Sequence, residues 1–535
     1  MGSYQPFLIA NLRTGLQLNL EPWLLPKDAF SMLENAYLEN GVIVKRNGYS
    51  LFADTGTGYP ITGIFHYIES DGSKSLLVTD TKRLYEYNTS TKALDDKDGS
   101  DYYTGDASSF ISSCNWLDKV YMANAKDQCR EYNGSTVSTW KVDITGDANN
   151  NLDYCRLIMT LKERIILFYT SEDGVLYPQR ARWCTASNPD AWNNDEYIDA
   201  PTYEHIKGAA YMGDDIIVFF DESVWMLKYT GDSTLPFRWE RVSTIAGCAS
   251  PFSVIEYDKA FALDKLGLVA ADEFSVNRID AKLSRFILEF NPNQADLVYG
   301  GLCKELKQMW FLYPSYNATA PDRALIFNYE DWSFSTFIIP LNCLGTYVSQ
   351  DVVTWESASG SWADYPGKWV EGRGIVGYPL MLGGASNGKV YKLNDTYGDA
   401  SSNIAMTIDT GRWNPFVKDG RKARLGYIDF LVECNEGYEL EIDFFLDFND
   451  TSYQTKTLKF NKSGQKAWVR IFSGAIGNSH QIRIRDNKND QQPKIHAMIP
   501  YFKPAGRLTI ELVDIAEYLI MGGDYLSIGG ERMKL

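Results

Sequence analysis

One hairpin pattern recurs along the chain and decides the fold. It first reads Leu76-Leu-Val-Thr-Asp-Thr-Lys-Arg-Leu84-Tyr-Glu-Tyr-Asn88, and it returns as Val120-Tyr-Met-Ala-Asn-Ala-Lys-Asp-Gln-Cys129-Arg-Glu-Tyr-Asn133. Each copy consists of an apolar strand, a tight polar turn and a second strand rich in aromatic residues. Further copies, some less clean, lie at 165–177, 216–229, 266–279, 310–327 and 380–394.

The copies recur at a nearly constant interval. Each copy has one anchor residue in or near its second strand: Leu84, Cys129, Leu176, Val224, Phe274, Leu325 and Val390. Successive anchors are 45, 47, 48, 50, 51 and 65 residues apart. A four-stranded unit of roughly 40 to 50 residues is one blade of a β-propeller. We therefore predict a six- or seven-bladed β-propeller over residues 59–400. A run of β-sandwiches is the alternative, but sandwiches have no reason to repeat at this interval.

The composition agrees with an all-β protein. Aromatic residues make up 14% of the 535 residues, and they favour strands over helices. The net charge is −17, so the chain lacks the excess of basic residues that nucleic-acid-binding proteins have. No apolar run approaches the roughly 20 residues that span a bilayer, so we expect neither a membrane anchor nor a signal peptide. Eight cysteines without a C-x-x-C pair predict reduced thiols.

Two regions lie outside the repeat. Residues 1–58 predict a docking leader, with a helix over 24–38 that Pro26 opens and a strand from Val42. Residues 401–535 alternate apolar and polar side chains, which predicts a separate antiparallel β domain with one wet face. The long last interval contains a Trp-rich stretch near 344–375, which we interpret as an insertion between blades.

Motifs of catalysis lack their structural context. Gly384-Ala-Ser-Asn-Gly388 matches the G-x-S-x-G of a hydrolase, and the same stretch nearly spells a phosphate-binding loop. Both motifs need a following helix, whereas a strand pattern follows here, so a hairpin turn is the better interpretation. Four histidines, at positions 66, 205, 480 and 496, are too scattered to suggest a triad or a metal cage. We expect no enzyme and no cofactor.

One loop is a candidate calcium site. Its oxygen-bearing side chains alternate along the chain, as in calcium-binding loops, at Asp147, Asn149, Asn151 and Asp153. Leu152 replaces the glycine that makes the sharp turn, and Ile158 stands where the closing Glu belongs. A solvated loop is the alternative interpretation.

Two kinds of residue are candidates for contact with partners. The first kind is basic: Arg421, Lys422 and Arg424 with Lys418, and Arg483 and Arg485 with Lys488. Each cluster either contacts DNA or is a solvated strand face. The second kind is the series Trp355, Trp362 and Trp369, which would suit glycan binding if exposed.

Several motifs together resemble one known family. The N-terminal ones are Leu25-Pro26 followed by Leu33-Glu-Asn-Ala36 and Gly41, then Lys45-Arg-Asn-Gly-Tyr49. Later ones are Arg182-Trp183 with Asn188-Pro-Asp-Ala-Trp192, Ala249-Ser-Pro-Phe-Ser253 leading to Phe261, and the Trp355, Trp362 and Trp369 series. In this order they resemble the β-propeller tail proteins of short-tailed phages, called nozzle proteins or tail tubular protein B. The resemblance touches most of residues 10–400 and is loose beyond them, where no specific motif carries over.

The resemblance implies a structural role in the virion tail. It implies a hexameric ring, assembled in the cytoplasm of the bacterial host, that lies below the adaptor ring, extends the DNA-ejection channel and often carries tail fibres. Viral DNA would pass through without sequence-specific binding, and an acidic wall would repel its phosphates. Two alternatives remain open: a receptor- or glycan-binding tail protein, and a glycan hydrolase that uses a pair of carboxylates.

Overall fold

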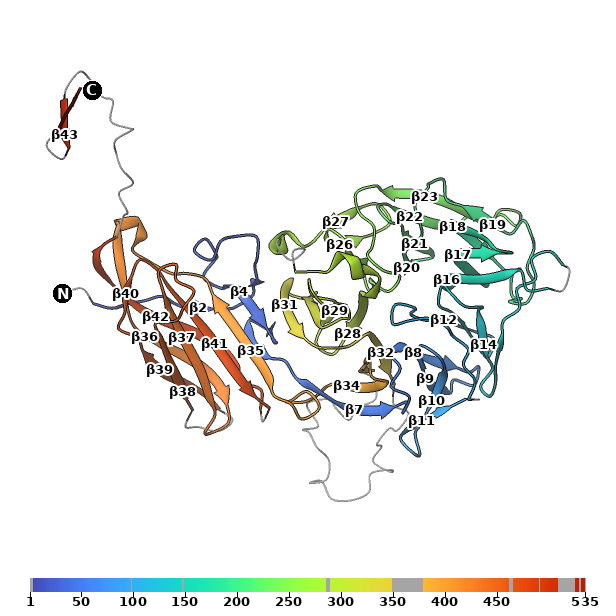
Figure 1. Ribbon diagram of the computed structural model, residues 1–535, viewed down its shortest axis with the longest axis horizontal. Helices are drawn as coiled ribbons and strands as arrows, with labels where there is room; N and C mark the ends of the chain where they lie inside the picture. Colours follow the sequence, from blue (N-terminus) through green and yellow to red (C-terminus); the bar gives the residue numbers. More distant parts are fainter. Residues whose placement is uncertain are drawn as a thin grey trace.

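The computed structural model describes residues 3–97, 99–146, 149–284, 289–348, 379–460, 465–489, 491–508, 525–528 and 531–534. Figure 1 shows a propeller joined side by side to a second β body, so the all-β prediction is confirmed. Across these ranges the only helices are 3₁₀ helices, at η1 (Ala281–Leu283), η3 (Pro292–Leu297) and η6 (Val417–Asp419). No helix in the described part is long and apolar enough to cross a membrane.

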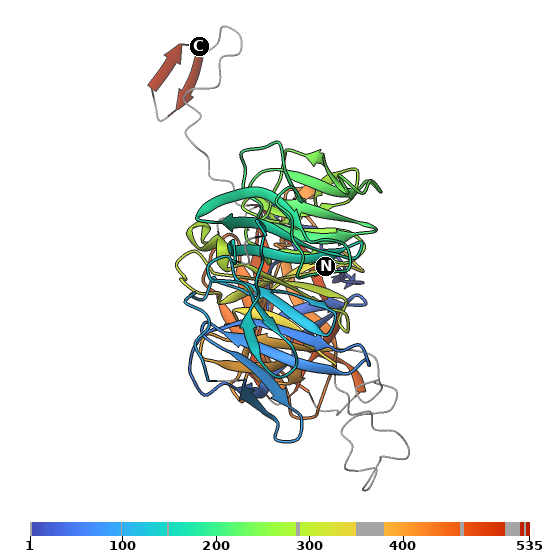
Figure 2. The same cartoon turned by 90° about the vertical axis from the view of Figure 1, so that its right-hand side faces the viewer.

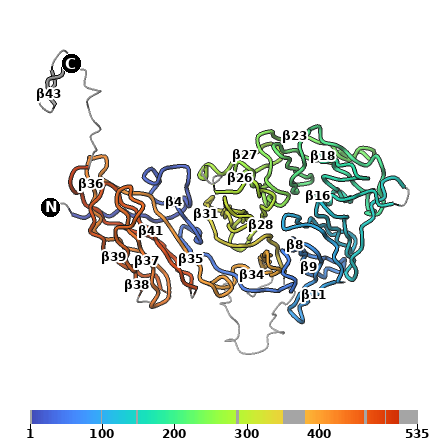
Figure 3. The backbone as a smooth tube through the Cα atoms, viewed as in Figure 1, coloured from blue at the N-terminus to red at the C-terminus, as the bar shows by residue number. Residues whose placement is uncertain are grey.

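Seven four-stranded units make the propeller, and its circular path is easily followed in Figure 3. The first blade consists of β8 (Ile61–Ile68), β9 (Lys74–Asp80), β10 (Leu84–Asn88) and β11 (Ala93–Asp96). The second consists of β12 (Ser112–Trp116), β13 (Lys119–Ala123), β14 (Arg130–Tyr132) and β15 (Val137–Thr139). The third consists of β16 (Leu152–Leu161), β17 (Arg164–Glu172), β18 (Val175–Trp183) and β19 (Tyr197–Asp199). The fourth consists of β20 (Gly208–Met212), β21 (Asp215–Phe219), β22 (Val224–Tyr229) and β23 (Phe237–Ser243). The fifth consists of β24 (Val254–Glu256), β25 (Ala260–Asp264), β26 (Gly267–Ala271) and β27 (Val276–Arg278).

The last two blades use the chain ends differently. The sixth is β28 (Tyr299–Cys303), β29 (Gln308–Tyr313), β30 (Arg323–Asn328) and β31 (Ser333–Ile338), and it continues into a sheet of the second body, whereas the other blades are separate sheets. The seventh is β32 (Cys343–Tyr347), β33 (Leu380–Gly384), β34 (Lys389–Thr396) and β7 (Gly48–Asp54). Because β7 precedes the first blade in sequence and completes the last, it holds the two ends of the ring together.

The second body is a β-sandwich of two sheets, which lies behind the propeller in the orthogonal view of Figure 2. We call one the outer sheet; its order is β39 (Gln465–Phe472), β36 (Arg421–Cys434), β42 (Lys494–Arg507), β6 (Val42–Lys45) and β5 (Ala36–Glu39), with β1 (Gln5–Pro6) and β2 (Ile9–Ala10) on β42 and β40 (Ile476–Gly477) on β36. We call the other the bridging sheet, because it continues from β31 through β4 (Ala29–Glu34) to β35 (Ile404–Thr410), β41 (His480–Lys488), β37 (Glu439–Leu446) and β38 (Gln454–Lys459), with β3 (Gly15–Leu16) on β4. One further hairpin pairs β43 (Tyr525–Ile528) with β44 (Glu531–Lys534).

The predicted helix over 24–38 is wrong. Residues 29–34 and 36–39 are strands of the sandwich, so the leader is not a separate docking segment either. Leu33 and Ala36 belong to a core cluster that the sandwich shares with the fifth and sixth blades, whereas Tyr37 packs into a different cluster, made mostly of propeller residues. The buried residues Leu33, Ala36 and Tyr37 fall at helical spacing because Asn35, with a left-handed φ of 55°, interrupts the alternation between the two strands.

The repeat pattern placed the blades with two local errors. Six of the seven anchors lie in the third strand of a blade or next to it, but Phe274 lies in the turn after the third strand of the fifth. The Trp-rich stretch is not an insertion between blades, since the long connection joins β32 to β33 inside the seventh blade. Trp355, Trp362 and Trp369 lie outside the described residues.

Candidate interaction sites

A buried polar joint fixes the sandwich to the propeller. Its centre is Asn35, which is 2% exposed and has the left-handed φ of 55° that asparagine tolerates well. The Asn35 side-chain amide donates to the carbonyl of Ala405 in the sandwich at 2.7 Å. Its oxygen accepts from the backbone N–H of Ile338 in the propeller at 2.9 Å and from Nε of Arg46 at 2.8 Å. One side chain therefore connects both bodies.

Arg46 completes this domain joint. Its guanidinium forms a bidentate pair with Asp399, at 2.8 and 2.5 Å, and donates to the carbonyl of Ile338 at 2.8 Å. The Arg46 side chain is 2% exposed, so the charge is removed from water and depends on these partners. Two parallel N–H···O bonds fix orientation as well as distance. The pair thus fixes Asp399, just after the last propeller strand, next to Arg46, just before the first.

Lys45, the residue before Arg46, carries a second buried charge into the sandwich. Its Nζ lies 2.5 Å from the carboxylate of Asp486, and both side chains are 0% exposed. Nζ also donates to the carbonyl of Lys488 at 2.6 Å, and the Tyr438 hydroxyl donates to the same Asp486 carboxylate at 2.5 Å. The ion pair connects the outer sheet, through β6, with the bridging sheet, through β41.

Close backbone packing explains the glycine that follows. A Cβ on Gly48 would lie 2.0 Å from the carbonyl oxygen of Gly398. Because this oxygen belongs to the backbone, no change of side-chain conformation can remove the clash. The motif Lys45-Arg-Asn-Gly-Tyr49 therefore supplies a buried ion pair, the domain joint and a backbone crossing in consecutive residues. The sequence signal that was missed is a pair of charges, Lys45 and Arg46, directly after the apolar strand 42–44.

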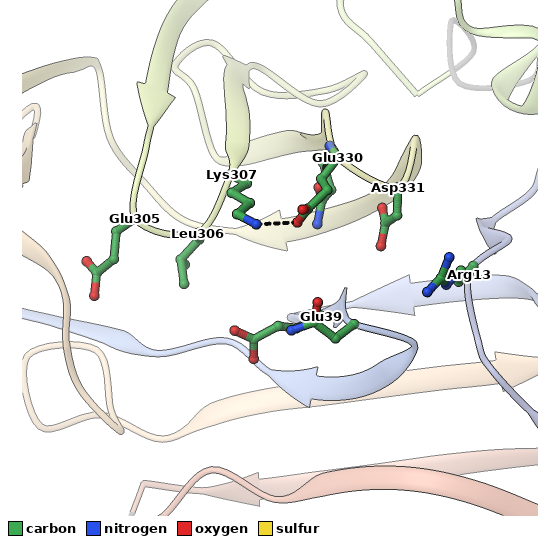
Figure 4. A pocket seen from close by; sticks show the side chains of 9 residues that line it. Arg13, Glu39, Glu305, Leu306, Lys307, Glu330 and Asp331 are labelled. Carbon is green, nitrogen blue, oxygen red and sulfur yellow. Dashed lines mark hydrogen bonds and ion pairs between the residues drawn. The ribbon is translucent and has the colours of Figure 1, made fainter. Parts of the chain in front are cut away.

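A polar cavity of about 260 Å³ lies where the propeller meets the sandwich. Figure 4 shows its carboxylates and cations arriving from both bodies, and its lining is Arg13, Glu39, Asn40, Glu305, Leu306, Lys307, Asn328, Glu330 and Asp331. The Lys307 ammonium pairs with Glu330 at 2.6 Å. Burial raises the pKa of Asp331, although hydrogen bonds from Ser333 oppose the shift. The cavity has polar walls and one apolar side chain, unlike the mostly apolar pockets that bind small molecules.

The third blade contains a charge network of two arginines and two carboxylates. Glu172 accepts two hydrogen bonds from Arg182, at 2.8 and 2.9 Å, and one from Arg180 at 2.9 Å. Arg180 also forms a bidentate pair with Asp199 and lies between the rings of Tyr177 and Tyr197. Burial raises the pKa of Glu172, but the hydrogen bonds and charges of the two arginines outweigh it and lower the pKa overall. Every group in the network has a partner, as a structural role requires.

In the candidate calcium loop, Asn151 and Asp153 use side-chain oxygens to accept hydrogen bonds from other groups of the protein. The side-chain oxygen of Asn151 accepts from the backbone N–H of Ile144 at 2.9 Å, and a carboxylate oxygen of Asp153 accepts from the N–H of Gly174 and the hydroxyl of Ser171, both at 2.8 Å. Asp147 lies outside the described residues. Within the described ranges no group of three or more His, Cys, Asp and Glu side chains could hold a metal ion.

The two basic clusters differ. Arg483 and Arg485 form bidentate pairs with Asp409 and Asp443, with the closer contact of each pair at 2.6 Å, so these charges are compensated. Arg421, Lys422 and Arg424 lie on β36, and among the described residues they form no ion pair. The cluster of Arg421, Lys422 and Arg424 therefore remains a candidate contact surface.

The catalytic motifs are structural. Residues 385–388 turn directly from β33 into β34, and the N–H of Ala385 donates to the carbonyl of Lys389 at 2.9 Å, so the hairpin prediction is confirmed. His66 lies in β8, where its Nε2 accepts from the backbone N–H of Val348 at 3.4 Å. Burial lowers the pKa of His66, as expected for a strand histidine packed beside Tyr347.

Comparisons with known proteins assign no family to the chain. No protein-family model matches the chain, and no curated protein matches it. Among solved structures it is similar to a candidate 6-phosphogluconolactonase of Bacteroides uniformis, with 10% identity, 65% of this chain and 91% of that chain covered, and a TM-score of 0.35. It is also similar to an exo-β-1,3-galactanase of Phanerochaete chrysosporium, with 7% identity, 73% and 95% covered, and a TM-score of 0.24. The extracellular domain of a candidate one-component system of B. thetaiotaomicron matches with 9% identity, 91% and 63% covered, and a TM-score of 0.38.

Proposed function

We propose that the protein is a structural component of a short-tailed phage tail, in which six copies form a nozzle ring below the adaptor. The ring would extend the DNA-ejection channel and offer attachment for tail fibres. The observation that carries the proposal is the domain joint. The two motifs that resemble the nozzle family, around Asn35 and from Lys45 to Tyr49, provide the buried contacts that hold the two bodies together.

A rigid two-body subunit suits a ring. Neighbours in a ring meet through two different surfaces of the same chain, and the angle between those surfaces must be constant for the ring to close. A propeller and a sandwich held by a buried bidentate pair can each provide one surface at a fixed angle. The acidic charge, −17 for each copy, also suits a channel wall that repels passing phosphates.

The test is electron microscopy of the particle that carries the protein, together with the purified protein. We expect a single six-fold ring at the distal end of a short tail. The purified protein should also fail to retain double-stranded DNA at low salt, where electrostatic binding is strongest. A monodisperse monomer that cleaves bacterial surface polysaccharide, and forms no ring with the neck proteins, would show that the proposal is wrong. Peripheral spikes on the particle would favour an adhesin instead.

A further inference from the structure

The exposed face of the outer sheet carries a row of aromatic rings. Tyr427 on β36 lies between Phe472 on β39 and Tyr501 on β42, with ring centroids 5.9 and 4.4 Å away. Tyr4 of the N-terminal segment extends the row, with its ring 5.7 Å from that of Tyr427. Figure 1 shows these three strands at the end of the molecule opposite the propeller. The row is therefore far from the domain joint.

Large apolar side chains on this face remain open to solvent. Phe472 is 60% exposed and Trp468, four residues earlier on the same strand, is 53% exposed. Arg470 between them lies 4.0 Å above the ring of Tyr427 and forms a bidentate pair with Asp429, at 2.6 and 2.8 Å. Trp, Tyr and Arg are the residues that contribute most to the energy of protein–protein interfaces. Their grouping on one flat face marks a contact surface.

Basic side chains border the aromatic row. Lys503 lies directly across from Arg424 in the β36–β42 ladder, and Lys422 points to the same side as Arg424. None of these three forms an ion pair among the described residues. We call the aromatic row and these cations the basic aromatic face. Its charge predicts an acidic partner.

The propeller of the same chain offers a surface of opposite charge. Residues 48–400, which form the propeller, contain 30 Lys and Arg and 48 Asp and Glu, a net charge of 30 − 48 = −18, whereas the rest of the chain contains 22 and 21, a net charge of +1. One side of the propeller has a larger net negative charge than the other. In the first five blades, the turns after the first and third strands contain twelve acidic and three basic residues. On the opposite side, the turns after the second strands contain four of each, and the connections from each fourth strand to the next blade contain nine acidic and five basic residues. We call the first set the acidic turn face.

We propose that the basic aromatic face of one copy docks against the acidic turn face of the next copy. The two surfaces differ, so each bound copy leaves one of each kind open, and repetition generates a ring if the rotation closes. The inference rests on the proposed ring and names the surfaces that build it. Complementary charge would align the copies, and the exposed rings of Trp468 and Phe472 would be buried in the contact.

Two variants separate the surfaces. The first, Lys422→Glu with Trp468→Ser and Lys503→Glu, changes only the basic aromatic face. The second, Asp195→Lys with Asp214→Lys and Asp258→Lys, changes only exposed turn residues of the third, fourth and fifth blades. A matched control carries the same kinds of change on the opposite side of the propeller: Tyr316→Ser, Lys126→Glu and Lys265→Glu.

Mass photometry of the full chain, alone and with the neck proteins, gives the readout. We expect rings from the wild type and the control, and monomers from each variant, with affinity between copies weakened at least about 30-fold, the loss typical of removing a hot spot. An equal mixture of the two variants should form dimers that grow no further, because each variant retains the surface that the other lacks. Circular dichroism confirms that each variant is folded.

Other outcomes overturn the inference in distinguishable ways. Rings formed equally by wild type and both variants would refute this contact and leave the nozzle proposal standing. Dimers formed by one variant alone would show that the surface this variant retains pairs with itself. Loss of binding to host polysaccharide by the first variant, with assembly unchanged, would make the basic aromatic face an adhesion site. A wild type that forms no ring, even in the particle, would refute the ring and this contact together.

Discussion

At Lys45 a single ammonium group is enclosed between the two sheets of the sandwich. We expect Lys45→Met to destabilise the protein by about 3 to 5 kcal/mol, because the carboxylate of Asp486 stays buried without its cation. Urea unfolding of the full chain measures the loss. The double variant Lys45→Met with Asp486→Leu should recover most of the stability, since no charge is then left buried.

The exposed pair of Lys459 and Glu439 is the matched control for Lys45. Its nitrogen and oxygen lie 2.6 Å apart, but the Lys459 side chain is 66% exposed, so water screens the charges. Lys459→Met should therefore change the free energy of unfolding by less than about 1 kcal/mol. Equal losses at Lys45 and Lys459 would show that burial is not what makes the first pair important.

At Glu172 the structure predicts a dependence on pH. The folded state has a lowered Glu172 pKa, so its ionised form stabilises the blade at pH values above the unfolded pKa of about 4.3. The stabilisation is lost as the pH falls through the lower folded pKa. We expect Glu172→Gln to destabilise the protein by about 3 kcal/mol at pH 7, and the difference from wild type to shrink steadily below pH 4.

Chemical denaturation at a series of pH values measures this difference. The exposed Glu436, which has no ion pair among the described residues, provides the control. Glu436→Gln should leave the stability unchanged across the series. A Glu172→Gln deficit that stays constant from pH 7 to pH 3 would mean that the charge of Glu172 does not stabilise the blade.

At the scale of elements, strand β7 closes the propeller, and Gly48 begins it. A Cβ at Gly48 would meet a backbone oxygen at 2.0 Å, so Gly48→Ala must push β7 away from the turn at Gly398. We expect a loss of about 1 to 3 kcal/mol, the usual cost of overpacking. Hydrogen exchange should become faster in β34, the partner of β7, and stay unchanged in the blades opposite.

Gly506 is the control for this substitution, since a Cβ there would meet nothing within 4 Å. Gly506→Ala should be neutral within about 0.5 kcal/mol. Unchanged exchange in β34 of the Gly48→Ala variant would show that β7 does not hold the ring closed.

The same elements show what sequence could predict. The hairpins at 76–88 and 120–133 predicted their blades because each strand is short, alternates and ends in a polar turn. Strands β4 and β5 were missed because Leu33 faces one core and Tyr37 another, which erases the alternation. The domain joint depends on contacts between residues as far apart as Asn35 and Ala405, and no local pattern encodes such a pairing. The basic residues of β36 were identified, but not the aromatic rings beside them, because neighbours across strands are distant in sequence.

At the scale of the whole molecule, the angle between propeller and sandwich depends on Arg46. Arg46→Leu removes the bidentate pair with Asp399 and the bond to Asn35, so the two bodies should move relative to each other while each stays folded. We expect small-angle X-ray scattering to report a larger maximum dimension. We also expect proteolysis near residues 397–403 to become at least about tenfold faster, because that rate change corresponds to lowering the free energy of local opening by about 1.4 kcal/mol. Arg83→Leu is the control, because it removes an arginine whose two ion pairs, with Asp96 and Asp101, both lie beside the same blade. Ring assembly should fail in Arg46→Leu and proceed in Arg83→Leu, since a ring closes only when every copy presents its two surfaces at one angle. Normal rings from Arg46→Leu would show that contacts between copies, and not the joint, set that angle.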